Sequence, residues 1–202
     1  MKKLALFALL TAAGVANATP SFMPVGPQTN VAVSTVLAGG WTQCHVSSLA
    51  TPIGTFGEQV LNACQGGKLM MAGRVTGSDT LLVLAAADRA DTIFNTGYMN
   101  TSTTHIANGS QWYYAPDYSW GFTALDDAVY KYQCDSSASS PTSMCLHTIA
   151  NVGGYRINDI ITFGDHYEKI FFVPNEVPEP ASLALLGLAS AGLMTARRRR
   201  RS

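Results

Sequence analysis

Two apolar segments without any charged residue, one near each end of the chain, confine the folded domain to the residues between them. The first runs from Leu4 to Val15 behind the basic pair Lys2-Lys3, and it is too short for a comfortable membrane span. Ala16 and Ala18 frame a small-x-small cleavage site directly after it. These features predict a signal peptide that signal peptidase removes, so that the mature chain begins at Thr19 outside the cytoplasm. The alternative is a buried N-terminal helix.

The second apolar segment, Ala181 to Ala196, is followed by a cluster of arginines. Its sixteen uncharged residues would span about 24 Å as a helix, short of a hydrocarbon core of about 30 Å. Basic residues stay on the cytoplasmic side of a membrane, so Arg197 to Arg201 place the C-terminus inside and the body outside. Pro178 and Pro180 keep the approach extended, because proline disfavours helix in the residue before it. The pattern predicts a marginal transmembrane helix, suited to a temporary hold.

A Pro-Glu-Pro stem precedes this segment, at Val177, Pro178, Glu179 and Pro180. Stem, apolar segment and arginine cluster, in this order over residues 177–202, resemble the PEP-CTERM sorting signal of exported bacterial proteins. The resemblance implies that exosortase, a membrane-embedded cysteine transpeptidase-like enzyme, reads the signal and that the tail is removed at or near the motif. It also implies a Gram-negative bacterium that makes exopolysaccharide, a transient inner-membrane anchor, and a body sent to the cell surface or a biofilm matrix. The alternative is a plain C-terminal anchor with a chance Pro-Glu-Pro stem.

The formal net charge of zero is an average over unlike parts of the chain. Seven of the thirteen basic residues lie at the ends of the chain, at positions 2, 3 and 197–201, and the rest of the chain has six basic against thirteen acidic residues, a net charge of −7. A nucleic-acid partner requires a basic face, so this balance argues against one.

Four cysteines follow the predicted cleavage site, at Cys44, Cys64, Cys134 and Cys145. An even number in an exported chain favours two disulfides, with three connectivities open. Short loops close most readily, which favours Cys44–Cys64 together with Cys134–Cys145. A metal site is the alternative, but the chain lacks the CxxC pairs typical of one. Neither a metal nor a cofactor is therefore expected.

Residues 19–176, between the signal peptide (1–18) and the tail, consist of short apolar runs separated by Gly, Asn, Asp and Ser. β-Branched and aromatic residues are frequent in the runs, which is typical of strands. The pattern predicts a single mainly β domain, a β-sandwich or a related all-β fold, with a short helix over residues 57–65. The predicted strands are residues 31–37, 68–75, 80–87, 110–115, 127–134, 145–150 and 168–173.

Three stretches of the body are less clear. Residues 80–92 could also form a helix, because Ala and Leu favour one, although the preceding turn favours a strand. Residues 21–30 contain two prolines and predict a mobile arm. The Gly-Gly-aromatic sequences that begin at Gly39 and Gly153 indicate either a faint internal repeat or two tight turns that need glycine for a positive φ.

Histidines and aspartates are the candidate acid–base residues of the body. They are His45, His105, His147, His166, Asp126, Asp127, Asp159 and Asp165. The sequence has no HExxH, HxH or GxSxG motif, and a catalytic role is not expected for any of the four histidines. The aspartates read as solvated turn residues rather than as a sugar-cleaving pair or a calcium loop. No catalytic residue is predicted.

Aromatic residues gather between positions 112 and 122 and suggest a carbohydrate surface, because sugar rings dock on flat aromatic faces. The candidate contacts are Trp112, Tyr114, Tyr118 and Trp120. Trp112 and Tyr114 would share one face of a strand, so packing in the core is the competing interpretation. The body is thus expected to be a non-enzymatic structural or carbohydrate-contacting module with exopolysaccharide as a candidate partner. The alternative is a secreted hydrolase that acts on extracellular polysaccharide.

Overall fold

The computed structural model describes residues 20–98, 103–129 and 140–175 of the 202-residue chain. The predicted signal peptide, its cleavage site at Ala18 and Thr19, and the tail from Val177 onward lie outside these residues. Within the described ranges, no helix is both long enough and apolar enough to cross a membrane.

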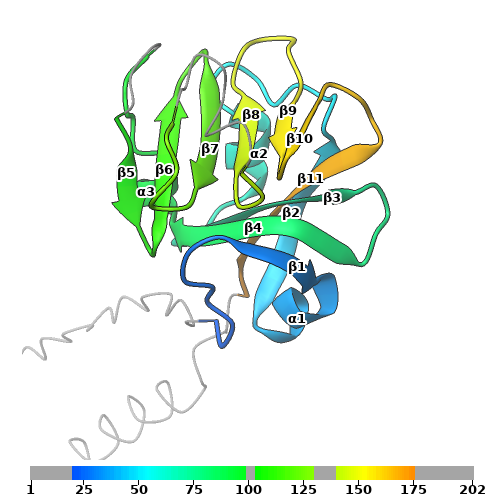
Figure 1. The fold of residues 1–202 in the computed structure, drawn as a ribbon. Coiled ribbons are helices and arrows are strands. Elements are labelled where there is room, and N and C mark those ends of the chain that lie inside the picture. Colours follow the sequence, from blue (N-terminus) through cyan, green and yellow to red (C-terminus); the bar gives the residue numbers. More distant parts are fainter. Residues whose placement is uncertain (1–19, 99–102, 130–139, 176–202) are drawn as a thin grey trace, which may run out of the picture. The chain divides into compact units, whose positions relative to one another are not determined.

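Five strands form the first sheet, and all of its neighbouring pairs are antiparallel. They are β1 Gln28–Ala32, β2 Trp41–Ser48, β3 Lys68–Val75, β4 Thr80–Asp88 and β11 Tyr167–Pro174. Their order is β1-β4-β3-β11-β2, so β11 lies inside the sheet between β3 and β2 (Figure 1). The last described strand is therefore part of the interior of this sheet.

Six strands form the second sheet, which is a meander of antiparallel neighbours. They are β5 His105–Ala107, β6 Ser110–Ala115, β7 Ser119–Thr123, β8 Met144–His147, β9 Tyr155–Ile157 and β10 Ile160–Thr162. The described helices are α1 Val33–Ala38, α2 Glu58–Ala63 and α3 Arg89–Thr92. In Figure 1 the strands of the second sheet run across those of the first. The predicted mainly β fold is confirmed.

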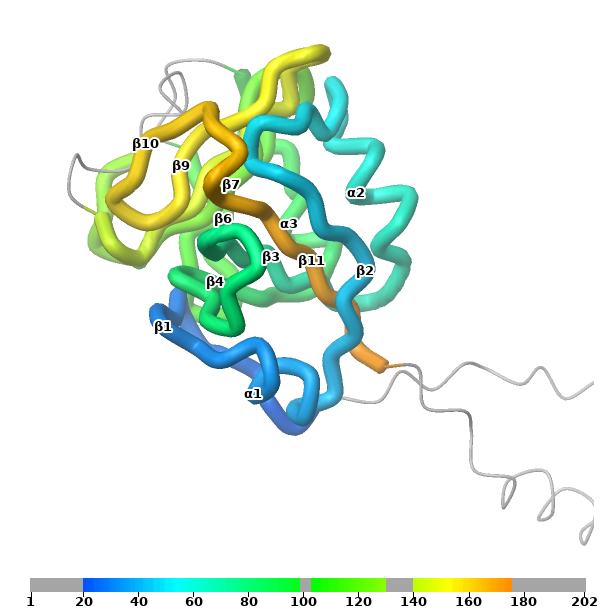
Figure 2. The backbone as a smooth tube through the Cα atoms, turned by 90° about the vertical axis from the view of Figure 1, so that its right-hand side faces the viewer, coloured from blue at the N-terminus to red at the C-terminus, as the bar shows by residue number. Residues whose placement is uncertain are grey.

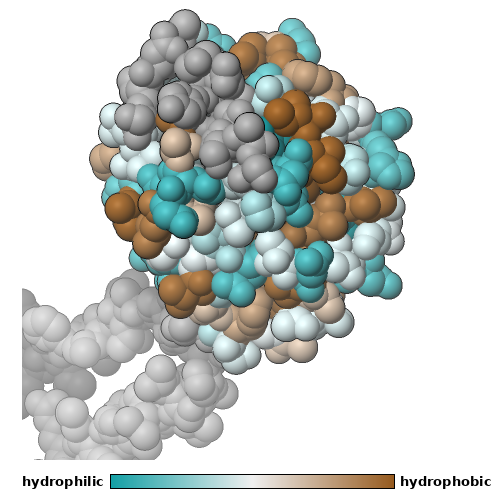
Figure 3. Space-filling view, viewed as in Figure 1, coloured by the Kyte–Doolittle hydropathy of each residue, from teal (hydrophilic) through white to brown (hydrophobic). Residues whose placement is uncertain are grey.

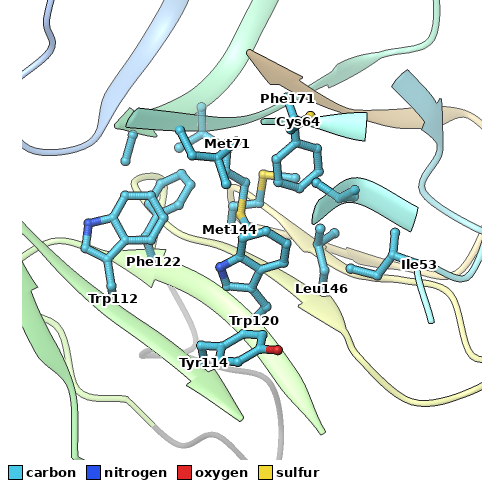
Figure 4. Packing of buried hydrophobic residues seen from close by; sticks show 14 of the residues in the cluster. Ile53, Cys64, Met71, Trp112, Tyr114, Trp120, Phe122, Met144, Leu146 and Phe171 are labelled. Carbon is cyan, nitrogen blue, oxygen red and sulfur yellow. The ribbon is translucent and has the colours of Figure 1, made fainter. Parts of the chain in front are cut away.

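The main core lies between the two sheets. Successive side chains on a strand point to opposite faces, so β3 directs Met71 into this core and Met70 to the outer face. The ring of Trp120 in β7 contacts that of Phe171 in β11 at 5.3 Å between centroids (Figure 4). Gly73 lets the sheets approach closely, since a Cβ there would lie 2.7 Å from Ile157 Cγ1. Burial on both faces explains why β3 and β4 are almost continuously apolar.

A second core covers the outer face of the first sheet. Phe22 and Met23 of the N-terminal stretch and Val36 of α1 pack there against Trp41 and Phe172. Hydrogen bonds also hold the same stretch, because Asn108 Nδ2 donates to the Pro24 carbonyl at 2.6 Å and Gly26 N donates to the Asn108 carbonyl at 2.8 Å. The prediction of a mobile arm over residues 21–30 is therefore wrong. Its apolar side chains close a core that would otherwise face solvent.

Several predicted elements agree with the structure. The strands expected at 68–75, 80–87, 110–115 and 168–173 are β3, β4, β6 and β11, and the expected helix is α2. Helix begins only at Arg89, after β4 has ended, which excludes the alternative of a helix over 80–92.

Other predicted strands need correction. The strand expected at 31–37 is wrong beyond Ala32, because Val33 begins α1 and Val36 uses the helical turn to reach the outer core. The strand expected at 145–150 ends at His147, where Thr148 N turns to donate to the Tyr118 carbonyl. Residues 127–129 are not in a strand, and residues 130–134, the remainder of the expected 127–134 strand, lie outside the described residues.

The two Gly-Gly-aromatic sequences behave as tight turns. Gly40 and Gly154 both have φ of 91°, and each precedes the first residue of a strand. The two strands, β2 and β9, belong to different sheets and have different neighbours. The shared glycines therefore reflect a shared backbone conformation rather than two equivalent halves.

The disulfide Cys44–Cys64 links β2 to the end of α2, as the spacing of the cysteines predicts. Cys145, in β8, is also disulfide-bonded. Its predicted partner Cys134 lies outside the described residues, so that pairing stays a prediction.

Candidate functional site

The N-terminal stretch is attached to the folded body at the turn between α1 and β2. Phe22 N donates to the Gly39 carbonyl at 3.1 Å, and Trp41 Nε1 donates to the Phe22 carbonyl at 2.6 Å. Gly39 has no room for a side chain, because a Cβ would lie 2.2 Å from Phe22 Cβ. We name residues 39–42, Gly39 to Thr42, the terminal corner.

The C-terminal end of the described body is attached to the same terminal corner. Asn175 N donates to the Gly40 carbonyl at 2.8 Å, and the Thr42 hydroxyl donates to the Asn175 side-chain oxygen. Pro174 pairs with Trp41 at the end of the β11–β2 ladder. Figure 2 shows the end of β11 beside the start of β2. The first and last described segments therefore meet at one place, which sequence reasoning had identified only as a glycine turn.

Three of the four candidate sugar-contacting rings are buried in the main core. Trp112 and Trp120 have relative exposures of 1% and 0%, and that of Tyr114 is 7%. Trp120 Nε1 donates to the Thr92 carbonyl at 2.8 Å, and Tyr114 OH donates to the Phe56 carbonyl at 3.0 Å. A buried ring cannot present its face to a polysaccharide, so the interpretation of these three residues as carbohydrate contacts is wrong. Both faces of β6 and β7 are covered, which a local pattern cannot reveal.

Tyr118, the fourth candidate, is half-buried and contacts the Tyr98 ring at 5.0 Å. Sequence reasoning missed the large apolar side chains that are exposed. They include Val25, Leu37, Val46, Phe56, Phe94, Tyr98, Ile106, Ile161 and Phe163. The residues that flank them in the sequence are like those that flank buried positions. Figure 3 shows brown, apolar side chains interspersed with teal, hydrophilic ones over one face of the body. No periodicity in the sequence distinguishes them from buried residues.

The four histidines lie in different surroundings. His45 Nε2 lies 3.0 Å from the Ser47 hydroxyl, and burial, followed by the charge of Lys169, lowers the pKa of its ring. Burial also lowers the pKa of His147, whose ring stacks on that of Tyr155 at 5.3 Å. His166 is exposed. The ring contacts of these three histidines are with phenylalanine and tyrosine rings.

His105 is the one described histidine in contact with a carboxylate. Its Nε2 lies 2.8 Å from Asp91 Oδ1, and its ring stacks on Phe94 at 4.5 Å between centroids. A carboxylate-oriented imidazole is one part of a nucleophile-activating arrangement. Among the described residues, no hydroxyl or thiol forms a hydrogen bond with His105. The contact joins α3 to β5.

The candidate carboxylates do not converge. Asp127 accepts hydrogen bonds from the hydroxyls of Thr123 and Ser140, at 2.5 and 2.6 Å, and so closes a loop. Asp126, Asp159 and Asp165 are exposed. Over the described ranges, no group of three or more His, Cys, Asp or Glu side chains is arranged to hold a metal ion.

Lys169 is a buried cation in β11 with a relative exposure of 1%. Its Nζ donates to the carbonyls of Ser48, Leu49 and Thr51 at 2.5, 3.4 and 2.6 Å. Burial lowers the pKa of Lys169 to about 8. The amine thus ties the loop after β2 to the centre of the first sheet.

The stability of the protein should depend on pH through Lys169. In the unfolded chain the amine has a pKa of 10.5, against about 8 in the fold, so between these values the unfolded state binds more protons. The free energy of unfolding should therefore rise with pH across this window, by about 3 kcal/mol at most, and stay flat below pH 8 with respect to this group. Urea unfolding at pH 7.5, 8.5 and 9.5 measures it. A midpoint that falls steadily over this range would contradict the assignment.

Comparison with known proteins identifies the segment directly after Asn175. Residues 176–201 match the model of the PEP-CTERM protein-sorting motif. No curated protein and no solved structure matches the chain, so no family is found for the body.

The motif implies that the protein is exported, that exosortase processes it, and that its sorting is associated with a membrane. It begins one residue after Asn175, whose backbone hydrogen bond to Gly40 is the last one described in the body. The folded body therefore extends up to the edge of the sorting segment.

Proposed function

We propose that residues 20–175 form a non-enzymatic surface or matrix module that the C-terminal segment delivers to its destination. The signal peptide exports the chain, the apolar segment Ala181–Ala196 holds it in the inner membrane with the arginines in the cytoplasm, and exosortase removes the tail at or near Pro178-Glu179-Pro180. The sorting motif at residues 176–201 is the observation that carries this proposal. The orientation follows from the arginine cluster, because basic residues stay on the cytoplasmic side.

Several features of the body support a structural role. The side chains with the most reactive chemistry form internal contacts: Cys44 is joined to Cys64, Lys169 binds three carbonyls, and Asp127 binds two hydroxyls. Arg74 and Glu168 form an ion pair between β3 and β11. A domain whose ends are both attached to one corner is also suited to display, since its opposite end points away from the point of attachment.

Intact-mass measurement of the surface-released protein tests the sorting proposal. The expected species begins at Thr19 and lacks the apolar segment and arginines. Replacement of Pro178, Glu179 and Pro180 by alanine should abolish release and leave an unprocessed, membrane-held chain, because the extended stem that the enzyme grips would be lost. Ser182→Ala, which changes the tail outside the stem, is the control and should be processed normally. A released protein that still ends at Ser202 would refute the proposal.

A further inference from the structure

One face of the body has no charged residue of its own. It consists of residues 20–27, β1, α1 and the outward side of β2, which together cover the outer core of the first sheet. The sequence contains no Asp, Glu, Lys or Arg between positions 4 and 57. We name this surface the uncharged face. Figures 1 and 2 both place α1 and β1 at the end of the body opposite β9 and β10.

Exposed apolar side chains lie on the uncharged face. Val25 is 70% exposed, Leu37 in α1 is 45% exposed, and Val46 in β2 is 41% exposed. Val46 pairs with Ile170, whose side chain belongs to the outer core, so Val46 points to the same side of the sheet. The face therefore combines apolar and uncharged polar groups.

The charges nearest to the uncharged face are mostly paired. The outward sides of β3, β4 and β11 carry two ion pairs without net charge, Lys68–Asp88 and Arg74–Glu168. Asp79, whose backbone carbonyl accepts from Val33 N, has an exposed side chain next to the start of α1. Glu58 lies on α2, whose Val60 packs into the main core. An anionic bilayer surface repels acidic groups, and this repulsion falls off within a Debye length. The body as a whole is acidic, so its uncharged face is repelled less by an anionic bilayer than its other faces are.

The uncharged face also contains the place where the sorting segment leaves the body. Asn175 is bound to Gly40 in the terminal corner, and only residues 176–180 separate it from the apolar segment that starts at Ala181. Even fully extended, this connection reaches about 20 Å. While the tail is in the membrane, the terminal corner is held within that distance of the bilayer.

We propose that the uncharged face lies against the lipid headgroup surface while the chain is held by its tail. The inference rests on the proposed membrane-held state and adds the orientation of the body within it. The β9–β10 end then points away from the membrane. The processing enzyme meets the stem at the terminal corner, with no acidic side chain of the uncharged face between the body and the bilayer.

Site-specific quenching tests this orientation. The chain from Thr19 to Ser202 is reconstituted in phosphatidylethanolamine vesicles with about a quarter phosphatidylglycerol. A fluorophore is attached at Leu37→Cys or, as the matched control, at Ile161→Cys in β10; the two side chains are 45% and 49% exposed. Nitroxide lipids labelled on the headgroup are the quencher. Quenching at position 37 should be about twofold stronger than at position 161, because only a residue at the interface contacts the headgroups.

Three other outcomes would overturn the proposed orientation. Equal quenching at both positions, or stronger quenching at position 161, overturns the orientation but leaves the sorting proposal intact if the chain floats with the vesicles. A chain that does not float with the vesicles contradicts the membrane-held state, and the orientation falls with it. Energy transfer between copies labelled at position 37, without lipid quenching, would show that a second copy covers the face instead. Thermal melting of both labelled proteins verifies that they are folded.

Discussion

A Gly153→Ala variant should lose at least about 3 kcal/mol of folding free energy and melt roughly 10 °C lower than the unmodified protein. The added Cβ would lie 1.9 Å from the Ala50 carbonyl oxygen and 2.3 Å from its carbonyl carbon. Both atoms belong to the backbone, so no side-chain rotation relieves the overlap. The neighbouring segment cannot easily shift, because Leu49 N donates to the Tyr167 carbonyl and the Leu49 carbonyl accepts from Gly154 N, both at 2.7 Å. Thermal denaturation followed by circular dichroism measures the loss.

Gly77→Ala is the matched control for this substitution. Gly77 has φ of 75° and nothing within 4 Å of an added Cβ, so the change introduces backbone strain without a clash. It should cost only about 1 kcal/mol. If the two variants melted at the same temperature, the close contact between the loop after β2 and the segment before β9 would not contribute to stability.

Replacement of Lys169 by methionine should destabilise the fold by about 3 kcal/mol. Methionine fills a similar volume but donates no hydrogen bond, so the carbonyls of Ser48, Leu49 and Thr51 would lose their shared donor. The loss of the buried cation removes a desolvation cost, which offsets part of this effect. The lost hydrogen bonds outweigh it, because a hydrogen bond from a charged donor contributes about 1.5–3 kcal/mol. The carbonyls of Ser48 and Leu49 keep the donors Thr51 N and Gly154 N, so the Thr51 carbonyl is the most affected. Urea unfolding at pH 7.5 measures the difference.

Lys68→Met tests the same chemical change at the surface. Lys68 pairs with Asp88, and their side chains are 29% and 59% exposed, so its loss should cost at most about 1 kcal/mol. The rise of stability above pH 8 should persist in Lys68→Met and disappear in Lys169→Met. An equal loss in the two variants would show that the hydrogen bonds from Lys169 to these carbonyls do not contribute to stability.

Strands with unbroken apolar character were predictable from the sequence. β3, β4, β6 and β11 lie inside their sheets or are covered on both faces, and their composition carries that information. β2 and β10 are edge strands with exposed polar or isolated apolar residues, and no run of side chains identifies them. The sequence also did not predict that β1 ends at Ala32 and α1 begins at Val33, because the two residues have similar neighbours in the sequence. The outer core decides between strand and helix at that point.

The candidate site likewise has one part that the sequence predicts and one part that only the folded structure reveals. The Pro-Glu-Pro stem, apolar segment and arginine cluster are contiguous, so their order alone identified the sorting motif at residues 176–201. The terminal corner joins Phe22, Gly39, Gly40 and Asn175, which are distant in sequence, and only the folded chain brings them together. The rings of Trp112 and Trp120 looked available for a ligand because burial depends on the opposite sheet.

Local sequence patterns were therefore sufficient to identify the sorting motif of this protein and its class of fold. A sorting segment is read by a machinery that recognises a short stretch of chain, and strand propensity depends on near neighbours. Exposure, by contrast, depends on which surfaces meet after folding, since the hydrophobic effect acts on contacts regardless of their separation in sequence. Only the tertiary structure could show that the aromatic stretch is core, that the N-terminal arm is ordered, and that both ends of the body meet on an uncharged face.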